Sequence, residues 1–236
     1  MARQDDLDRF YGLLDDLSQR VGGTRKLKNC TGYMDWPDRG VYFFLEPGET
    51  HRSTDQLRVA RVGTHAVSAG SSTSLWNRLR THRGATRGSY EGGGNHRGSV
   101  FRKRVGEAFL ERNSLHDEYP HWGEGTSANR DRRLDELELE RRVSDYLREL
   151  PFLWLNVDDE PSAESQRAYI ERNAIALLSN YQRDAIDPRS AEWLGRNSRS
   201  DKIRDSGLWN VNHVDEAYDP TFLDDVAIAV DDTRPP

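Results

Sequence analysis

The sequence contains few of the residues that mark secreted proteins, membrane proteins and cysteine-based metal sites. It holds one cysteine, Cys30, among 236 residues, so an internal disulfide and a cysteine-rich zinc module are both excluded. No apolar run reaches the roughly 20 residues that cross a bilayer, and the N-terminus lacks the apolar core of a signal peptide. We therefore expect a cytoplasmic protein that does not enter a membrane.

Several common catalytic motifs are also missing. There is no G-x-x-x-x-G-K-[ST] phosphate loop, no G-x-G-x-x-G after a strand and no G-x-S-x-G nucleophile elbow. The seven histidines form no H-E-x-x-H pair, and no lysine follows an acidic residue by two positions. These absences exclude the usual signatures of nucleotide hydrolases, dinucleotide-binding enzymes, serine hydrolases, zinc peptidases and nucleases with a D/E-x-K motif.

The net charge of −6 hides a segregation of charge along the chain. Between Arg78 and Arg104 there are eight basic residues and a single acid, Glu91. From Asp205 to the end, eight acidic residues face only Arg234. A local basic strip can bind phosphate whatever the overall charge, so nucleic acid remains a candidate partner.

Hydrophobic periodicity predicts a mixed fold. Short apolar runs predict strands over 40–46, ending at Pro47-Gly48, over 57–62 and over 151–157. Apolar stripes of helical spacing predict helices over 4–21, 74–82, 99–112, 132–150 and 161–181. A glycine-rich, cationic loop that we expect to be mobile joins the second and third of these helices. The expected fold class is therefore α+β, with a small three-stranded antiparallel sheet flanked by helices.

Two helices carry polar residues next to apolar ones. Leu75, Arg78, Leu79 and His82 follow the spacing i, i+3, i+4, i+7 and so share one face of the 74–82 helix. Glu171 lies at the margin of the apolar stripe of the 161–181 helix. An arginine, a histidine and a carboxylate are thus expected near the core rather than in water, either as a functional site or as ordinary buried ion pairs.

The order of these residues resembles the GIY-YIG nuclease family. Gly40-Val41-Tyr42 matches the first triplet, Arg61-Val62-Gly63 the second, and the helix carrying Arg78 and His82 the family's arginine helix. The strand over 152–157 and the helix bearing Glu171 match the element that supplies the metal-binding glutamate. Arg61 stands where the family usually has tyrosine, and about 65 residues separate the arginine helix from the third strand.

The resemblance implies a metal-dependent endonuclease that hydrolyses phosphodiester bonds. Glu171 would bind Mg²⁺ or Mn²⁺, Arg78 would hold a phosphate oxygen, and Tyr42 would act as general base with help from His82. His65 would take the role of the missing tyrosine beside Arg61, and the family's late asparagine would fall on Asn180.

The expected substrate is double-stranded DNA, and an enzyme of the restriction or defence type is the leading interpretation. Within the insertion over 83–150, we expect DNA contacts from Asn95, His96 and Arg97, which reach base edges, and from the basic residues around them. The complete expected set is Arg80, Arg83, Arg87, Asn95, His96, Arg97, Arg102, Lys103 and Arg104. Because many restriction enzymes cut both strands as dimers, a homodimer is also expected.

The expected organisation has three parts: a helical extension over 1–36, a nuclease domain over 37–186 and a C-terminal extension over 187–236. In the last part, Trp193, Trp209, Tyr218 and Phe222 look exposed in the sequence. Two alternatives stay open. One is a DNA-binding module that has lost cleavage because of Arg61, and the other is an interaction protein that uses the acidic, aromatic C-terminal region.

Overall fold

The computed structural model describes residues 2–236, which form an α+β fold with one four-stranded sheet. The strands are β1 (Arg25–Lys26), β2 (Gly40–Thr50), β3 (Leu57–Gly63) and β4 (Pro151–Asn156). The helices are α1 (Ala2–Val21), α2 (Leu75–Arg83), α3 (Val100–Asn113), α4 (Arg130–Asp135), α5 (Leu137–Glu149), α6 (Gln166–Leu178), α7 (Asp201–Ser206) and α8 (Phe222–Asp232). Short 3₁₀ turns occur at η1 (Leu27–Asn29), η2 (His96–Gly98) and η3 (Leu194–Asn197).

The sheet has the order β1-β4-β2-β3, and every neighbouring pair is antiparallel. The α+β class is therefore confirmed, but the sheet has four strands instead of the expected three. The additional strand, β1, is only two residues long and pairs Arg25 and Lys26 with the start of β4. A pair of charged residues carries no alternation of apolar and polar side chains, so no sequence pattern predicts this strand.

The central strand β2 is longer than expected. It continues through Pro47-Gly48 to Thr50, with irregular register against β3 after Phe44. Its pairing with β4 ends at Phe44, so Pro47 lies in a bulged two-stranded ribbon. A proline there removes no regular ladder hydrogen bond, and the expected end of the strand at Pro47 was therefore wrong.

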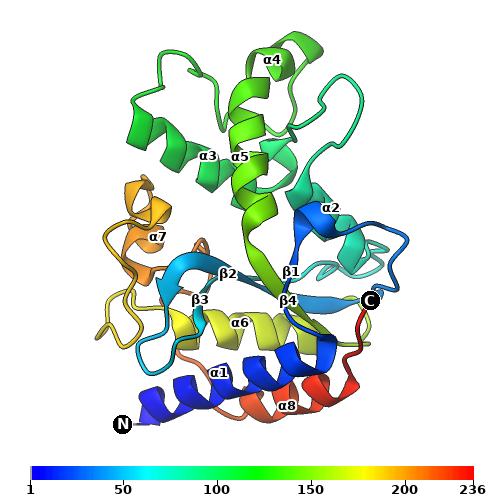
Figure 1. Ribbon diagram of the computed structural model, residues 1–236, viewed down its shortest axis with the longest axis vertical. Coiled ribbons are helices and arrows are strands. Elements are labelled where there is room, and N and C mark those ends of the chain that lie inside the picture. Colours follow the sequence, from blue (N-terminus) through cyan, green and yellow to red (C-terminus); the bar gives the residue numbers. More distant parts are fainter. Residues whose placement is uncertain (1) are drawn as a thin grey trace.

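Helices cover both faces of the sheet (Figure 1). One layer holds α1, α6 and α8, and the other side carries α2 and a lobe built from α3, α4 and α5. The side chains of β2 alternate between these layers: the Phe43 ring packs 5.7 Å from Phe10 of α1, and the Phe44 ring 5.5 Å from Phe101 of α3. Tyr42 therefore faces the same side as Phe44, toward α2 and α3.

Two expected helices have different bounds. The 132–150 helix is divided at Glu136 into α4 and α5, and α6 begins at Gln166 rather than near Pro161. Ser165 is the N-cap of α6, because its side chain accepts a hydrogen bond from the backbone N–H of Ala168 at 3.3 Å.

The C-terminal aromatic residues are inside the protein. Trp193, Trp209 and Phe222 are at most 2% exposed and belong to the same hydrophobic core as α1 and the sheet, and Tyr218 is half-buried against that core. The expectation that these rings are exposed was wrong, because the short elements after Asp187 fold back onto the sheet and α3. An interaction surface built from these rings is therefore not present.

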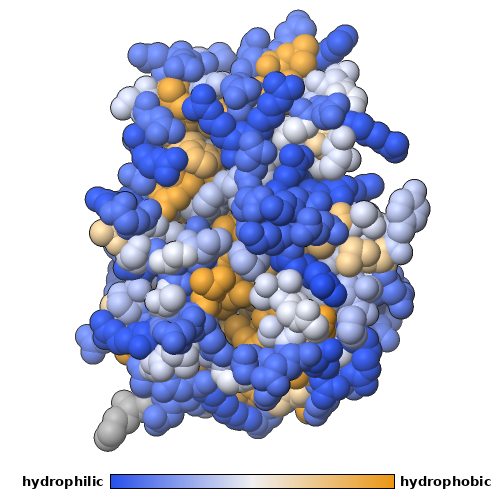
Figure 2. Space-filling view, in the orientation of Figure 1, coloured by the Kyte–Doolittle hydropathy of each residue, from blue (hydrophilic) through white to orange (hydrophobic). Residues whose placement is uncertain are grey.

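Polar residues cover most of the face shown in Figure 2, and apolar residues reach this surface mainly near its middle. Within residues 2–236, no helix combines the length and the apolar character that crossing a bilayer requires.

Candidate active site

Tyr42 lies on the central strand, and two glycines shape the backbone around it. Tyr42 is paired across the sheet with Gly63, and a Cβ atom at Gly63 would lie 2.3 Å from the Tyr42 hydroxyl oxygen. A Cβ at Gly40 would lie 2.1 Å from the carbonyl oxygen of Leu155. Both positions therefore require glycine for steric reasons, and the glycine of the second triplet allows the Tyr42 phenol to rest directly on β3.

His82 and Arg78 approach the phenol from α2. The Tyr42 hydroxyl is 2.9 Å from His82 Nε2, and His82 Nδ1 is 3.0 Å from Ser99 Oγ. Burial, followed by the charges of Arg78, Arg61 and Arg102, lowers the pKa of His82 well below its usual value. His82 is therefore a neutral imidazole, with one ring nitrogen on the phenol and the other on Ser99.

Glu171 reaches the same region from α6, at the end of β3. Its Oε1 accepts a hydrogen bond from the Thr64 backbone N–H at 3.1 Å. No ion-pair partner lies within 4.0 Å of this carboxylate among the residues described. Burial raises its pKa above the ordinary value, although Arg61, the Thr64 N–H, His213 and Arg78 act in the opposite direction.

Arg78 connects the phenol with the carboxylate. The Tyr42 phenol raises the pKa of the Arg78 guanidinium, burial acts against it, and Glu171 adds a weaker upward effect. The guanidinium donates a long hydrogen bond, 3.4 Å, to the Gly98 carbonyl, and its Nε has no partner. The structure thus brings Tyr42, Arg78, His82 and Glu171 together, with polar atoms that remain unsatisfied.

Arg61 and His65 border this group from β3 and the turn after it. Arg61 donates a hydrogen bond to the Trp209 carbonyl and lies 5.6 Å from the centroid of the Phe101 ring. The His65 Nε2–H donates a hydrogen bond to the Asp38 carbonyl at 3.1 Å, while Nδ1 of the same ring is buried without a partner. Burial and nearby arginines lower the pKa of His65 to about 4. At neutral pH His65 is uncharged.

Asn180 is not part of the group. It follows the C-terminus of α6, and its side chain donates to the Asp187 carbonyl at 2.8 Å and accepts from Arg3. Glu171 precedes it by nine positions, about 13 Å along a helix. The assignment of the late asparagine to Asn180 was therefore wrong, because the residue fixes the chain after α6 instead.

The structure separates the expected DNA-contacting residues into two groups. His96 and Arg102 are buried and both bind Glu140, and the side chain of Arg97 is 1% exposed in a two-bond pair with Glu136. Those three side chains cannot reach a duplex while paired, so including them was wrong. The other basic side chains and Asn95 are at least partly exposed: Arg80, Arg83, Arg87, Asn95, Lys103 and Arg104.

The glycine-rich segment before α3 is packed against α3 and α5. A Cβ at Gly94 would lie 2.3 Å from the Arg102 guanidinium carbon, and a Cβ at Gly93 would lie 2.6 Å from Leu137. The backbone N–H of Ala85 donates to the Gly93 carbonyl at 2.8 Å, and the backbone N–H of Gly92 donates to the Ala85 carbonyl at 3.1 Å. The glycines therefore allow the segment to pack closely on α3 and α5. Their number in the sequence indicates this close packing, and it is not by itself evidence of mobility.

Two further residues lie near the group and were missed from the sequence. His213 is close enough to Glu171 to lower the pKa of that carboxylate, and Asn210 makes two hydrogen bonds to the backbone of Val62. The Trp209 N–H also donates to Ala60. The 209–210 segment therefore completes the outer edge of β3, a long-range contact that no local sequence pattern indicates.

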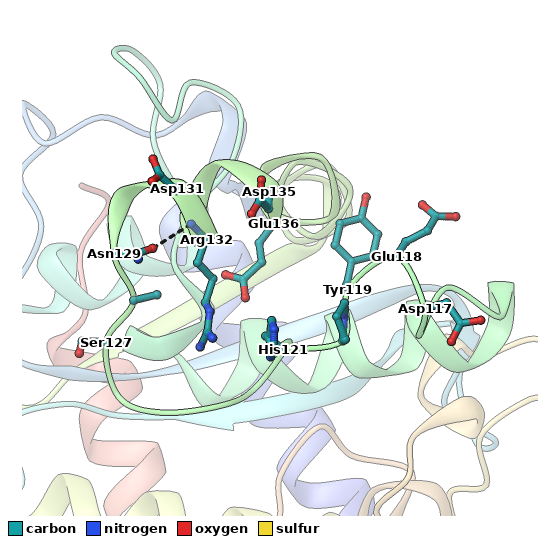
Figure 3. A pocket seen from close by; sticks show the side chains of 12 residues that line it. Asp117, Glu118, Tyr119, His121, Ser127, Asn129, Asp131, Arg132, Asp135 and Glu136 are labelled. Carbon is teal, nitrogen blue, oxygen red and sulfur yellow. Dashed lines mark hydrogen bonds between the residues drawn. The ribbon is translucent and has the colours of Figure 1, made fainter.

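A large pocket lies elsewhere, in the insertion (Figure 3). It has a volume of about 940 Å³ and is rich in carboxylates, with Arg132 and Glu136 extending from one side toward His121. Its acidic lining repels phosphate, so the pocket is not where a nucleic acid backbone would bind.

The whole chain, residues 1–236, matches the model of the GIY-YIG domain family, so the protein belongs to that family. Members of the family are generally endonucleases, which identifies this chain as a nuclease at the level of the family. Searches of curated proteins and of solved structures returned no match.

Proposed function

We propose that the protein is a divalent-metal-dependent endonuclease that hydrolyses DNA phosphodiester bonds, of the restriction or defence type. The observation that carries this proposal is the meeting of a phenol, a guanidinium and a carboxylate from β2, α2 and α6, without an ion pair that would satisfy the carboxylate. With His82, which contacts the phenol, four residues that are not adjacent in sequence converge there. If each residue had only its own structural role, no such convergence would be needed.

The residues present suit a single hard cation. Glu171 offers one carboxylate oxygen that accepts no hydrogen bond from the residues described, and burial raises the pKa of the group. Within residues 2–236 there is no cluster of three or more His, Cys, Asp or Glu, so a cation would keep several waters, as Mg²⁺ usually does. Bound at Glu171, Mg²⁺ or Mn²⁺ would supply Lewis-acid stabilisation of charge on the phosphate oxygens.

The remaining steps use side chains of this protein. Arg78 turns from Tyr42 to a non-bridging phosphate oxygen and stabilises the charge that develops in the transition state. That movement uncovers the Tyr42 hydroxyl, which is fully buried without substrate. In the tautomer in which Nδ1–H donates to Ser99, His82 Nε2 accepts the phenol proton while Tyr42 takes the proton of the attacking water. The water oxygen forms the new bond to phosphorus, and the 3′-oxygen leaves.

Digestion of supercoiled plasmid with Mg²⁺ tests the proposal. We expect the wild type and Glu192→Ala, which changes an exposed carboxylate, to nick or linearise the plasmid, and Glu171→Ala to be at least about 100-fold slower. Cutting that survives Glu171→Ala would overturn the metal assignment. A wild type that binds but never cuts would instead favour the DNA-binding module without cleavage, for which the arginine at position 61 is the motivating feature.

A further inference from the structure

A second groove runs beside the candidate active site and differs from the acidic pocket in charge. It has a volume of about 340 Å³ and lies between α2, the loop that follows α2, and α4. In Figure 1 that loop follows the edge of the upper lobe from α2 toward α4. The lining contains two arginines and no acid: Arg80, Thr81, Gly84, Ala85, Tyr90, Gly94, Asn95, Gly98 and Arg133.

Neither guanidinium group is paired with an acid or a hydrogen-bond acceptor. Within residues 2–236, the side chains of Arg80 and Arg133 make no hydrogen bond and no ion pair. By contrast, Arg97 of the same lobe is paired with Glu136, and Arg102 with Glu140. The groove therefore contains two guanidinium groups whose charge no carboxylate compensates, and both are available to bind an anion.

Arg133 is held in a fixed orientation by Tyr90. Its guanidinium carbon lies 3.7 Å above the centre of the Tyr90 ring, so the flat group is stacked on the aromatic face. A stacked guanidinium keeps its N–H donors in the plane, directed away from the ring. Such donors fit the tetrahedral oxygens of a phosphate, and little side-chain entropy is lost on binding because the stack already restricts the rotamer.

The groove adjoins the arginine of the candidate active site. Gly98, which lines the groove, accepts the hydrogen bond from Arg78, and Arg80 and Thr81 follow Arg78 on α2. A phosphate held by Arg78 would therefore lie at the edge of the groove, and a neighbouring phosphate of the same strand would enter it.

We propose that this groove binds a backbone phosphate of the substrate strand next to the cleaved one, through Arg80 and the Arg133–Tyr90 stack. The inference rests on the proposed nuclease function and deepens it by assigning a phosphate subsite. The subsite fixes the register of the strand relative to Arg78 and reads no base, because phosphate contacts carry no sequence information.

The adjacent residue on α4 provides a matched control. Arg132 carries the same charge as Arg133 and lines the acidic pocket, where it lies 3.8 Å from Glu124. Binding is measured by fluorescence anisotropy with a labelled duplex of mixed sequence, in EDTA and in the Glu171→Gln background, so that cleavage does not interfere. Each protein is titrated at several salt concentrations, and its melting temperature is recorded to verify folding.

We expect Arg133→Gln to bind about eightfold more weakly at 0.1 M salt and to reduce the slope of log K against log salt by about 0.9, the value of one phosphate contact. Arg132→Gln should bind as tightly as the parent or slightly tighter. Tyr90→Phe should bind DNA as tightly as the parent because the aromatic ring below Arg133 remains. Tyr90→Leu should weaken DNA binding because that ring is lost. Equal affinities and slopes for Arg133→Gln and Arg132→Gln would overturn the subsite.

Cleavage assays separate this result from a failure of the proposed function. A wild type that cuts plasmid while Arg133→Gln binds normally would overturn the groove alone. A wild type that never cuts, but whose binding depends on Arg133 and Tyr90, would support the groove and overturn the nuclease proposal. A protein that binds no duplex at any salt concentration would overturn both.

Discussion

Two polar groups inside this protein use the same residue types in opposite ways. In the insertion, Glu140 binds His96 and Arg102 by hydrogen bonds and ion pairs. Although burial opposes it, these donors hold the pKa of Glu140 at about 2. In the candidate active site, Glu171 has one backbone donor and a raised pKa.

The contrast between the two carboxylates separates a structural group from one that can accept a ligand. A buried carboxylate that is fully paired with cations and hydrogen bonds fixes the packing of the elements that supply its partners. A carboxylate with a free oxygen and uncompensated charge stabilises the fold less and binds a cation better. The insertion network therefore orders the lobe, and the group around Glu171 is the one that we propose as the active site.

The largest expected effect concerns the phenol of the candidate site. Tyr42→Phe removes one oxygen and keeps the ring, so it should lower the cleavage rate by about 10²–10⁴-fold, the usual range for loss of an acid–base group. The variant leaves His82 Nε2 without its partner at 2.9 Å. Its rate is measured by plasmid nicking with Mg²⁺, alongside Tyr33→Phe, which changes a fully exposed ring. Equal rates for both variants would remove Tyr42 from the mechanism.

A direct test of the comparison neutralises one carboxylate in each group. Glu140→Gln leaves the buried Arg102 cation without its counter-charge and should lower the free energy of unfolding by about 3–5 kcal/mol. Glu171→Gln removes an uncompensated charge and should change stability by less than about 1 kcal/mol or raise it. Urea denaturation at pH 7 measures both. Similar losses in the two variants would show that Glu171 is structural.

Glu46 is a third buried carboxylate, and its hydrogen-bond donors are uncharged, unlike the cations around Glu140. It accepts hydrogen bonds from Tyr146 at 2.6 Å and from Trp193 at 3.2 Å. Burial raises its pKa to about 7, against those hydrogen bonds. The folded state therefore binds a proton that the unfolded state releases near pH 4.5, and the stability that this proton contributes is lost as pH rises from about 4.5 to 7.

The expected loss over that interval is on the order of 3 kcal/mol, from the size of the pKa difference. Thermal or urea unfolding at several pH values from 4.5 to 8 measures it, and Glu46→Gln should flatten the profile over this interval. A wild-type profile that rises steadily up to pH 7, or one that Glu46→Gln leaves unchanged, would contradict the raised pKa.

Much of the fold followed from local patterns. The helical stripes predicted the bounds of α1, α2 and α3 to within two residues at each end. The short apolar runs predicted the bounds of β3 and β4 to within one residue. Those elements bury one face or both, so their periodicity is visible in the sequence. The exceptions are instructive: β1 is too short to show a period, and β2 passes through a proline because its ladder is already irregular there.

The pairing of buried charges could not be predicted in the same way. His96, Arg97 and Arg102 belong to a basic stretch that looks like a phosphate-binding strip, yet Glu136, between α4 and α5, and Glu140 of α5 bind their side chains. Arg133 stands outside that stretch and remains free in a groove beside Arg78. Which arginines have partners depends on contacts between residues about 40 positions apart.

The residue types of the candidate site and their order could be predicted from the sequence, because Tyr42, Arg78, His82 and Glu171 lie on regular elements whose apolar faces are visible in the periodicity. Only the tertiary structure decided which charges are compensated and which are open. Compensation is a matter of a few ångströms between distant segments, and electrostatic energy in a low-dielectric interior depends on that distance rather than on sequence separation.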